Sequence, residues 1–397
     1  MNFLKFLSMP IRVTIGYYAA FIILGLLTSV MGPAIPDLAE NTHSSLAELS
    51  RFIMAGSFGY LLGGFLGGRL YDRFRGHLIL SSALFVSAIF VALVPLMPLL
   101  GLLGVVLFFL GFAEGTLDTG GNSLLTWLHG DNVGPFMNGL HFFFGVGAFL
   151  APVVIAQIVA TTGTVFASFW IFALAALPIV LYVSRLPSPT VAHSVHNNAH
   201  ETLDLPLVGL MVALFFVYVG AEVGFGNWIY TYTVKLGLAN EVTANYITSA
   251  FWGSFTVGRL AGIPISSRYK PQLIMFSDLM VCLFSIGIIL LWPGSIIALW
   301  IGTLGLGFGM ASFFPSAMVM AGRLMHLSGR VTGFFLFGSG GGGMILPFII
   351  GQLIEPVGPH SMMRIIFIAL VINMAFLLGL LAYRPKRGKY IAKPVGD

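Results

Sequence analysis

Residues 110–122 read Leu-Gly-Phe-Ala-Glu-Gly-Thr-Leu-Asp-Thr-Gly-Gly-Asn, which spaces Glu114, Asp118 and Asn122 four apart in an otherwise apolar run. On a helix this spacing puts the three side chains on one face, each about 6 Å further along the axis. A carboxylate at bilayer depth costs about 3 kcal/mol on insertion scales, and such residues commonly mark a substrate or ion path. The stripe therefore predicts such a path; the alternative is a structural carboxylate paired with a neighbouring helix.

The composition around this stripe is that of a membrane protein. The chain has 397 residues, of which 57% are hydrophobic and 8% are charged, against about 25% charged in soluble domains. Its apolar runs are continuous rather than alternating, so we expect an all-α integral membrane fold and not a barrel. The single cysteine excludes an intrachain disulfide. A net charge of +5 does not indicate nucleic-acid binding, because the basic residues cluster at the ends of the apolar runs.

The apolar runs predict twelve transmembrane helices and the lipid bilayer as surroundings. Their expected ranges are 12–34, 50–69, 77–96, 100–124, 136–159, 164–184, 206–232, 243–264, 271–292, 296–322, 330–354 and 361–383. With a cytoplasmic N-terminus, 16 lysines and arginines fall inside and 3 outside, which accounts for all 19. This asymmetry predicts cytoplasmic termini and, for a bacterial cell, a multi-pass protein of the inner membrane.

The longest polar connection, residues 185–205, divides the chain into halves at 1–184 and 206–397. We interpret it as a cytoplasmic linker, because its three histidines have no second cluster with which to form a metal site. Three matches relate the halves at offsets of 195 to 197: Gly56-Ser57-Phe58 with Gly253-Ser254-Phe255, Leu110-Gly111-Phe112 with Leu306-Gly307-Phe308, and Pro152 and Gln157 with Pro347 and Gln352. Two six-helix halves related by an internal repeat are the plan of the major facilitator transporters.

A loop between the second and third spans carries a closer resemblance to that superfamily. It reads Gly68-Arg69-Leu70-Tyr71-Asp72-Arg73-Phe74-Arg75-Gly76-His77 and resembles the superfamily signature Gly-x-x-x-Asp-Arg-x-Gly-Arg-Lys. The resemblance implies a conformational latch made by Gly68, Asp72 and Arg73. We also expect Asp72 to cap and charge-pair at the cytoplasmic helix end.

Three segments resemble the branch that contains fucose–proton symporters and glucose/galactose and sodium-dependent glucose transporters. They are Leu117–Asn122, Asn138–Gln157 and Tyr218-Val219-Gly220-Ala221-Glu222-Val223-Gly224. The resemblance implies that Asp118 takes part in cation coupling and that Asn122 and Asn138 lie at the substrate. The coupling ion is then a proton or sodium, and no other cofactor is expected.

The remaining site residues follow from their chemistry. His141 is expected at a depth similar to Asp118, so we predict that it joins Glu114 and Asp118 in cation coupling, the alternative being a neutral core histidine. Glu222, Asn227 and Trp228 combine hydrogen-bonding groups with an aromatic face, as a sugar site requires. Asp278 and Arg259 are expected to form a structural ion pair.

Two functions remain open from the sequence. The first is a cation symporter of a small polar solute, such as a sugar, acting as a monomer by alternating access. The second is a proton-coupled exporter of drugs or other metabolites on the same fold, which would not need an acid–amide stripe together with Glu222. An enzyme is not expected, because the sequence holds no nucleotide loop, Cys/His cluster or Ser/His/Asp array.

Overall fold

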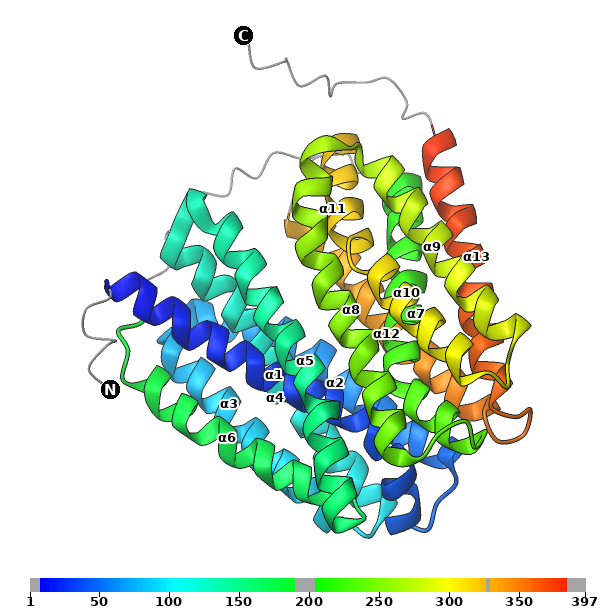
Figure 1. Ribbon diagram of the computed structural model, residues 1–397. Coiled ribbons are helices and arrows are strands. Elements are labelled where there is room, and N and C mark those ends of the chain that lie inside the picture. The colour runs from blue at the N-terminus through cyan, green and yellow to red at the C-terminus, as the bar shows by residue number, and fades with distance from the viewer. Residues whose placement is uncertain (1–7, 190–203, 326–328, 384–397) are drawn as a thin grey trace.

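The computed structural model describes residues 8–189, 204–325 and 329–383, and these form helices without strands (Figure 1). The α-helices are α1 (Met9–Asn41), α2 (Leu46–Arg73), α3 (Gly76–Leu93), α4 (Leu100–His129), α5 (Val133–Thr162), α6 (Phe166–Ser184), α7 (Leu205–Lys235), α8 (Glu241–Arg268), α9 (Pro271–Leu291), α10 (Ile296–Met310), α11 (Phe313–Leu324), α12 (Gly329–Leu353) and α13 (His360–Ala382). Two short 3-10 turns, η2 (Val94–Leu96) and η3 (Gly130–Asn132), follow α3 and α4.

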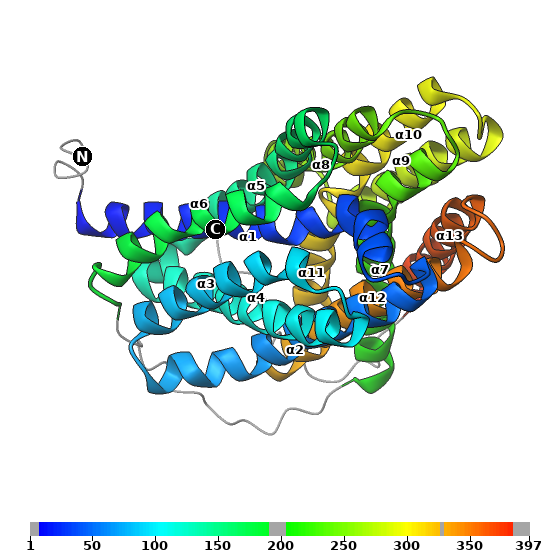
Figure 2. The same cartoon turned by 90° about the horizontal axis from the view of Figure 1, so that it is seen from below.

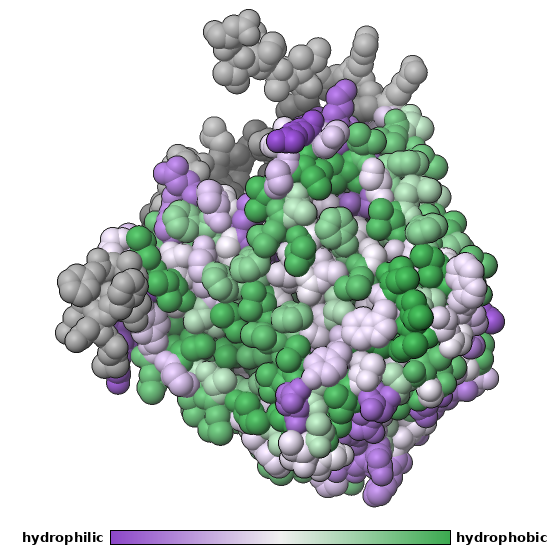
Figure 3. Space-filling model, viewed as in Figure 1, coloured by the Kyte–Doolittle hydropathy of each residue, from purple (hydrophilic) through white to green (hydrophobic). Residues whose placement is uncertain are grey.

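The all-α membrane fold predicted from the apolar runs is confirmed. Counting α10 and α11 as one, eleven helices in the described part of the chain are long and apolar enough to cross a membrane. The remaining predicted span, α8, falls outside this set because polar residues such as Asn245, Thr248 and Arg259 lower its hydropathy. Hydrophobic residues predominate across the middle of the face seen in Figure 3, as a protein surrounded by lipid requires.

The tenth predicted span is not one continuous helix. It breaks between α10 and α11 at Ala311 and Ser312. Pro315 has no N–H to donate to the carbonyl of Ala311, and its ring clashes with that carbonyl in a regular helix. The hydroxyl of Tyr218 donates a hydrogen bond to the carbonyl of Met310, the last residue of α10.

Glycines bring α2 and α4 into close contact. A Cβ at Gly111 would lie 2.0 Å from the carbonyl oxygen of Gly56, and one at Gly63 would lie 2.0 Å from that of Phe112. Small residues at this spacing let membrane helices approach closely. The repeat partner Gly307 does the same between α8 and α10, where a Cβ would lie 2.1 Å from Oγ of Ser254.

Helices α1–α6 and α7–α13 form two groups that meet mainly through α5 with α8, α2 with α12, and α1 with α7 (Figures 1 and 2). Residues 190–203 of the predicted linker lie outside the described residues, so the linker remains a prediction. Its described start is held to the first group by His77, whose ring bonds the carbonyl of Leu186 at 2.9 Å and the hydroxyl of Tyr17 at 2.7 Å.

The two groups are joined at one end of the bundle, which we call the closed end. There the amide of Gln157 on α5 donates to the hydroxyl of Tyr246 on α8. The amide of Gln352 on α12 donates to the carbonyl of Ala47 and, at 2.8 Å, to the hydroxyl of Ser50 on α2. At the opposite end, residues 263–268 of α8 are all exposed. Gln157 and Gln352 are the pair matched in the sequence repeat, so equivalent residues join the groups twice.

Candidate functional site

The stripe on α4 lies against α2. The hydroxyl of Tyr60 donates to Oδ2 of Asp118 at 2.8 Å, and Nδ2 of Asn122 donates to Oδ1 at 3.1 Å. Thr119 donates to the carbonyl of Gly64 at 3.2 Å. The predicted spacing of Asp118 and Asn122 on one face is confirmed by their contact. Asp118 is partly exposed and keeps acceptor capacity beyond its two donors.

Glu114, one turn earlier, is more deeply buried. Its side chain is 7% exposed, and its Oε1 is buried without a hydrogen-bond partner. Tyr60 lies within electrostatic range of both Glu114 and Asp118. No lysine, arginine or histidine among the described residues forms an ion pair with either carboxylate. The pair therefore provides acceptor oxygens at membrane depth that lack a compensating positive charge.

His141 makes other contacts than this pair. Asp118 is bonded to α2 and α4, and no hydrogen bond joins it to His141 among the described residues, so the predicted role of His141 in cation coupling stays a prediction. The His141 ring instead packs edge-on against Phe21, with 6.2 Å between ring centroids, and lies in the electrostatic field of Arg259 on α8. His141 thus belongs to a second polar cluster.

That second cluster contains Glu222 on α7 and Arg259 on α8. The Glu222 carboxylate also lies within electrostatic range of Arg259. The predicted pairing of Arg259 with Asp278 is wrong, because Asp278 accepts a 2.7 Å hydrogen bond from Ser312 and no ion pair joins the two residues. Asp278 thereby lies beside the first turn of α11, where a negative charge is favourable.

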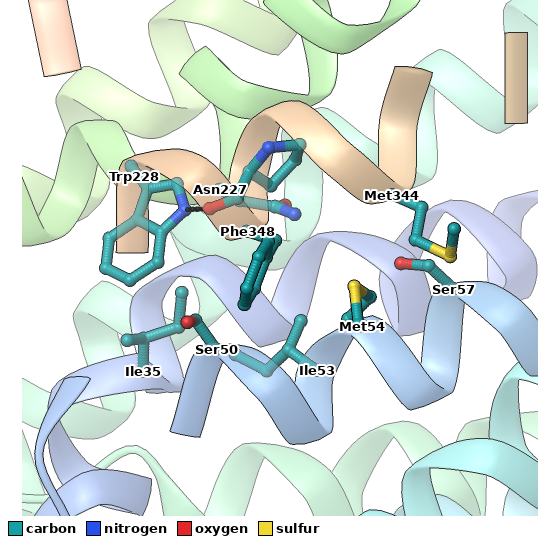
Figure 4. A pocket seen from close by; sticks show the side chains of 10 residues that line it. Ile35, Ser50, Ile53, Met54, Ser57, Asn227, Trp228, Met344 and Phe348 are labelled. Carbon is teal, nitrogen blue, oxygen red and sulfur yellow. Dashed lines mark hydrogen bonds between the residues drawn. The ribbon is translucent and has the colours of Figure 1, made fainter. Parts of the chain in front are cut away.

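Asn227 and Trp228 line a narrow pocket between α1, α2, α7 and α12 (Figure 4). Its other lining residues are Ile35, Ser50, Ile53, Met54, Ser57, Met344, Pro347 and Phe348. Asn227 is half-buried and has no side-chain hydrogen bond, so its amide is available to a ligand. Trp228 differs, because it is 1% exposed and its Nε1 donates to the carbonyl of Pro347 at 2.9 Å. The ring predicted to stack on substrate is therefore packed inside the protein.

This placement predicts a stability role for Trp228. Trp228→Ala should lower the free energy of unfolding by about 3–5 kcal/mol, because it leaves a cavity and an unpaired carbonyl. Thermal unfolding of purified protein measures the effect, and Trp292→Ala, at a ring that is 58% exposed, is the matched control. Equal melting temperatures for the two variants would contradict a packing role for Trp228.

The remaining predicted residues lie at the end opposite the closed end. Asn138 is exposed near the start of α5 and has no side-chain hydrogen bond. Gly68 is half-buried, while Asp72 and Arg73 are exposed in the last turns of α2. Asp72 does not cap α3, whose N-cap residue is Arg75 without a side-chain bond, so the predicted capping role is wrong.

Sequence reasoning missed Tyr60 and misassigned Arg259. Tyr60 adjoins Gly59 in a run of glycines at intervals of three or four, a pattern that marks the packed face of α2. Arg259 carried a stronger signal, since an arginine inside a membrane span is by itself a functional hypothesis. Both residues complete clusters that the sequence identified only in part.

An all-helical membrane bundle with polar clusters between its helices is typical of membrane transporters. The Major Facilitator Superfamily model matches residues 17–347, so the chain belongs to that superfamily. It is a membrane transporter and not an enzyme.

Curated relatives cover most of the chain. Sodium-dependent glucose transporter 1A of Mus musculus is 29% identical over 378 residues, covering 85% of this chain and 88% of the relative. Sodium-dependent glucose transporter 1 of Homo sapiens is 27% identical, with 84% and 72% covered. Major facilitator superfamily domain-containing protein 4A of Homo sapiens is 25% identical, with 92% and 91% covered.

Solved structures share the fold at low sequence identity. The nucleoside transporter NupG aligns with a TM-score of 0.70 at 15% identity, covering 95% of this chain and all of that one. The D-xylose-proton symporter aligns with a TM-score of 0.74 at 15% identity, with 93% and 97% covered. These similarities agree with the fold described above.

Proposed function

We propose that the protein is a secondary active symporter that moves a neutral sugar together with a proton or sodium ion. The observation that carries the proposal is the uncompensated pair of Glu114 and Asp118. A cation bound between these carboxylates supplies the missing positive charge, and crossing the membrane with it supplies the driving force.

The second cluster supplies the substrate side of the proposal. Glu222, Arg259 and His141 offer acceptors and donors of hydrogen bonds from α5, α7 and α8, which belong to both helix groups. Asn227 adds a free amide nearer the closed end. A solute bound between two groups that rock against each other is released on one side at a time. The names of the sodium-dependent glucose transporter relatives and of the xylose–proton symporter support both a sugar and a coupling cation.

The competing function is export of apolar compounds. Such a substrate would leave Glu222 and Arg259 desolvated without new hydrogen bonds, at a cost of several kcal/mol. The open hydrogen-bonding groups therefore favour a hydroxylated solute.

Counterflow in vesicles tests the proposal. Proteoliposomes loaded with unlabelled sugar should accumulate the same labelled sugar transiently, and net uptake should require an imposed sodium or proton gradient. Separate sodium-free and pH-clamped arms identify the ion. Absence of counterflow for a panel of neutral hexoses and pentoses would contradict sugar transport, and gradient-stimulated release of a lipophilic dye would favour export.

We further propose that the protein is a monomer in the cell inner membrane with both termini cytoplasmic and with halves at 1–184 and 206–397. The basic-residue asymmetry supports this orientation. Under it the closed end faces outward, because α2 begins there and α12 ends there.

A reporter experiment checks this orientation. Phosphatase and fluorescent-protein fusions placed at Asn197 and after Asp397 should both report a cytoplasmic location. Fusions at Gly163, between α5 and α6, should report the outside and serve as the matched control. A periplasmic signal at Asn197 would contradict the twelve-span topology.

A further inference from the structure

Arg259 lies on α8 at the contact between the two helix groups and forms no ion pair with a carboxylate among the described residues. It lies about 14 Å from the cytoplasmic end of the helix by helical rise. Its guanidinium carbon sits 4.5 Å from the centroid of the Phe255 ring, one turn earlier. Its Nε is buried without a hydrogen-bond partner. Stacking on Phe255 fixes the plane of the guanidinium but leaves this donor unused.

Two titratable groups on other helices, Glu222 of α7 and His141 of α5, lie within the electrostatic range of this guanidinium. The hydroxyl of Tyr218 also lies within hydrogen-bonding reach of Glu222. Neither Glu222 nor His141 forms an ion pair or a hydrogen bond with Arg259 among the contacts of the described residues. Glu222 and Arg259 are therefore opposite charges within electrostatic range of each other that no ion pair joins among the described residues.

A charged group that is partly buried is costly to leave without hydrogen bonds, and a ligand can supply them. Leaving buried donors and acceptors unpaired costs about 1–3 kcal/mol each, and more for charged groups. A hydroxyl both donates and accepts, so one hydroxyl can accept from a guanidinium N–H and donate to a carboxylate. The planar guanidinium can also bond two neighbouring oxygens at once. A polyhydroxylated solute can therefore accept hydrogen bonds from Arg259 and donate them to Glu222.

We propose that Arg259 is a substrate-contacting residue and that Arg259 and Glu222 form an open charge pair that selects neutral polyhydroxylated solutes over anionic ones. The proposal rests on the sugar symport proposed above and adds the residue that determines charge selectivity. The pair is neutral as a whole, so a carboxylate on the solute would face Glu222 without compensation. Removing the charge of Glu222 should shift the preference from neutral toward anionic solutes, because the positive charge of Arg259 would then have no nearby negative charge to balance it.

The test compares two sugars that differ at one carbon, D-glucose and D-glucuronate, by calorimetry on purified protein. The unsubstituted protein should bind glucose at least about 10-fold more tightly than glucuronate. Arg259→Gln should weaken glucose binding by about 10- to 100-fold, the loss of one charge-assisted hydrogen bond or more. Glu222→Gln should also weaken glucose binding, and should shift the ratio of glucuronate to glucose affinity at least about 10-fold toward glucuronate. Arg323→Gln, at an exposed arginine on α11, is the control and should change neither affinity.

The possible outcomes separate the two proposals. If the unsubstituted protein binds no neutral sugar, the proposed function fails and takes this inference with it. If it binds glucose but Arg259→Gln binds glucose equally well, only the inference fails. Thermal melts confirm that each variant is folded, and if Arg259→Gln does not fold, the affinity ratio of Glu222→Gln decides. An unchanged ratio in that variant overturns the charge selectivity.

Discussion

Asp118→Asn should abolish uphill sugar accumulation while leaving sugar exchange at least partly intact. The amide keeps the size of the carboxylate and imitates its charge-neutral, ion-loaded form, but it cannot take up and release a cation. At about −100 mV, one monovalent cation contributes about 2.3 kcal/mol, which corresponds to about 50-fold accumulation. The expected accumulation ratio of the variant is therefore close to one. Labelled-sugar uptake under an imposed gradient measures accumulation, and equilibrium exchange measures what remains.

The C-terminal half of the chain provides a matched control for the prediction on Asp118. Asp278 is also an aspartate within a membrane helix, but its carboxylate is occupied by Ser312. Asp278→Asn should retain gradient-driven accumulation. Uphill accumulation by Asp118→Asn at the level of the unsubstituted protein would remove Asp118 from the coupling mechanism.

Cross-linking Ser50→Cys to Gln352→Cys should stop transport completely and reversibly. The hydroxyl of Ser50 and the amide of Gln352 are 2.8 Å apart at the closed end, where α2 meets α12. A covalent link there prevents the two helix groups from separating, so the site cannot open on that side. Oxidation, or a short thiol-to-thiol reagent, should reduce uptake to background, and a reducing agent should restore it.

The chain has a single native cysteine, which simplifies the cross-linking experiment. Cys282 is buried in α9, so it does not react and need not be replaced. The two single-cysteine variants, treated in the same way, should retain uptake. Full activity of the cross-linked double variant, with the link verified by peptide mass spectrometry, would show that the closed end need not open.

The sequence predicted those features that depend on neighbours along one helix. Asp118 and Asn122 are four residues apart, and the helix alone brings them into contact. The bond between Asp118 and Tyr60, which lies 58 residues earlier, could not be predicted, because it depends on how α4 is rotated against α2. The glycines that fix that rotation are visible in the sequence, but which glycine faces which carbonyl is not.

This dependence on the packing between helices also explains why the pairing of Arg259 with Asp278 and the contact of Trp228 with a sugar were predicted wrongly. Arg259 lies on α8, which follows α7 and precedes α9, and the sequence offered an acid on each. In the structure Arg259 lies within electrostatic range of Glu222. Asp278 accepts a hydrogen bond from Ser312 at the break between α10 and α11, a break whose position depends on Pro315. Trp228 was expected beside a sugar because of its chemistry, but its indole N–H is bonded to α12.

Helix α2 carries both Tyr60, which bonds Asp118, and Ser50, which bonds Gln352. The two residues are ten positions apart, which spans about 15 Å of helix, and glycine contacts with α4 leave this segment little room to slide. We therefore expect occupancy of the carboxylates and closure at Ser50 to be linked equilibria. Thermodynamic linkage is reciprocal. If ion binding shifts the closure equilibrium by a given factor, closure changes the ion affinity by the same factor. Ion affinity can be measured by titration with the Ser50→Cys to Gln352→Cys cross-link formed and again after it has been reduced. The ratio of the two affinities gives the coupling free energy between ion binding and closure.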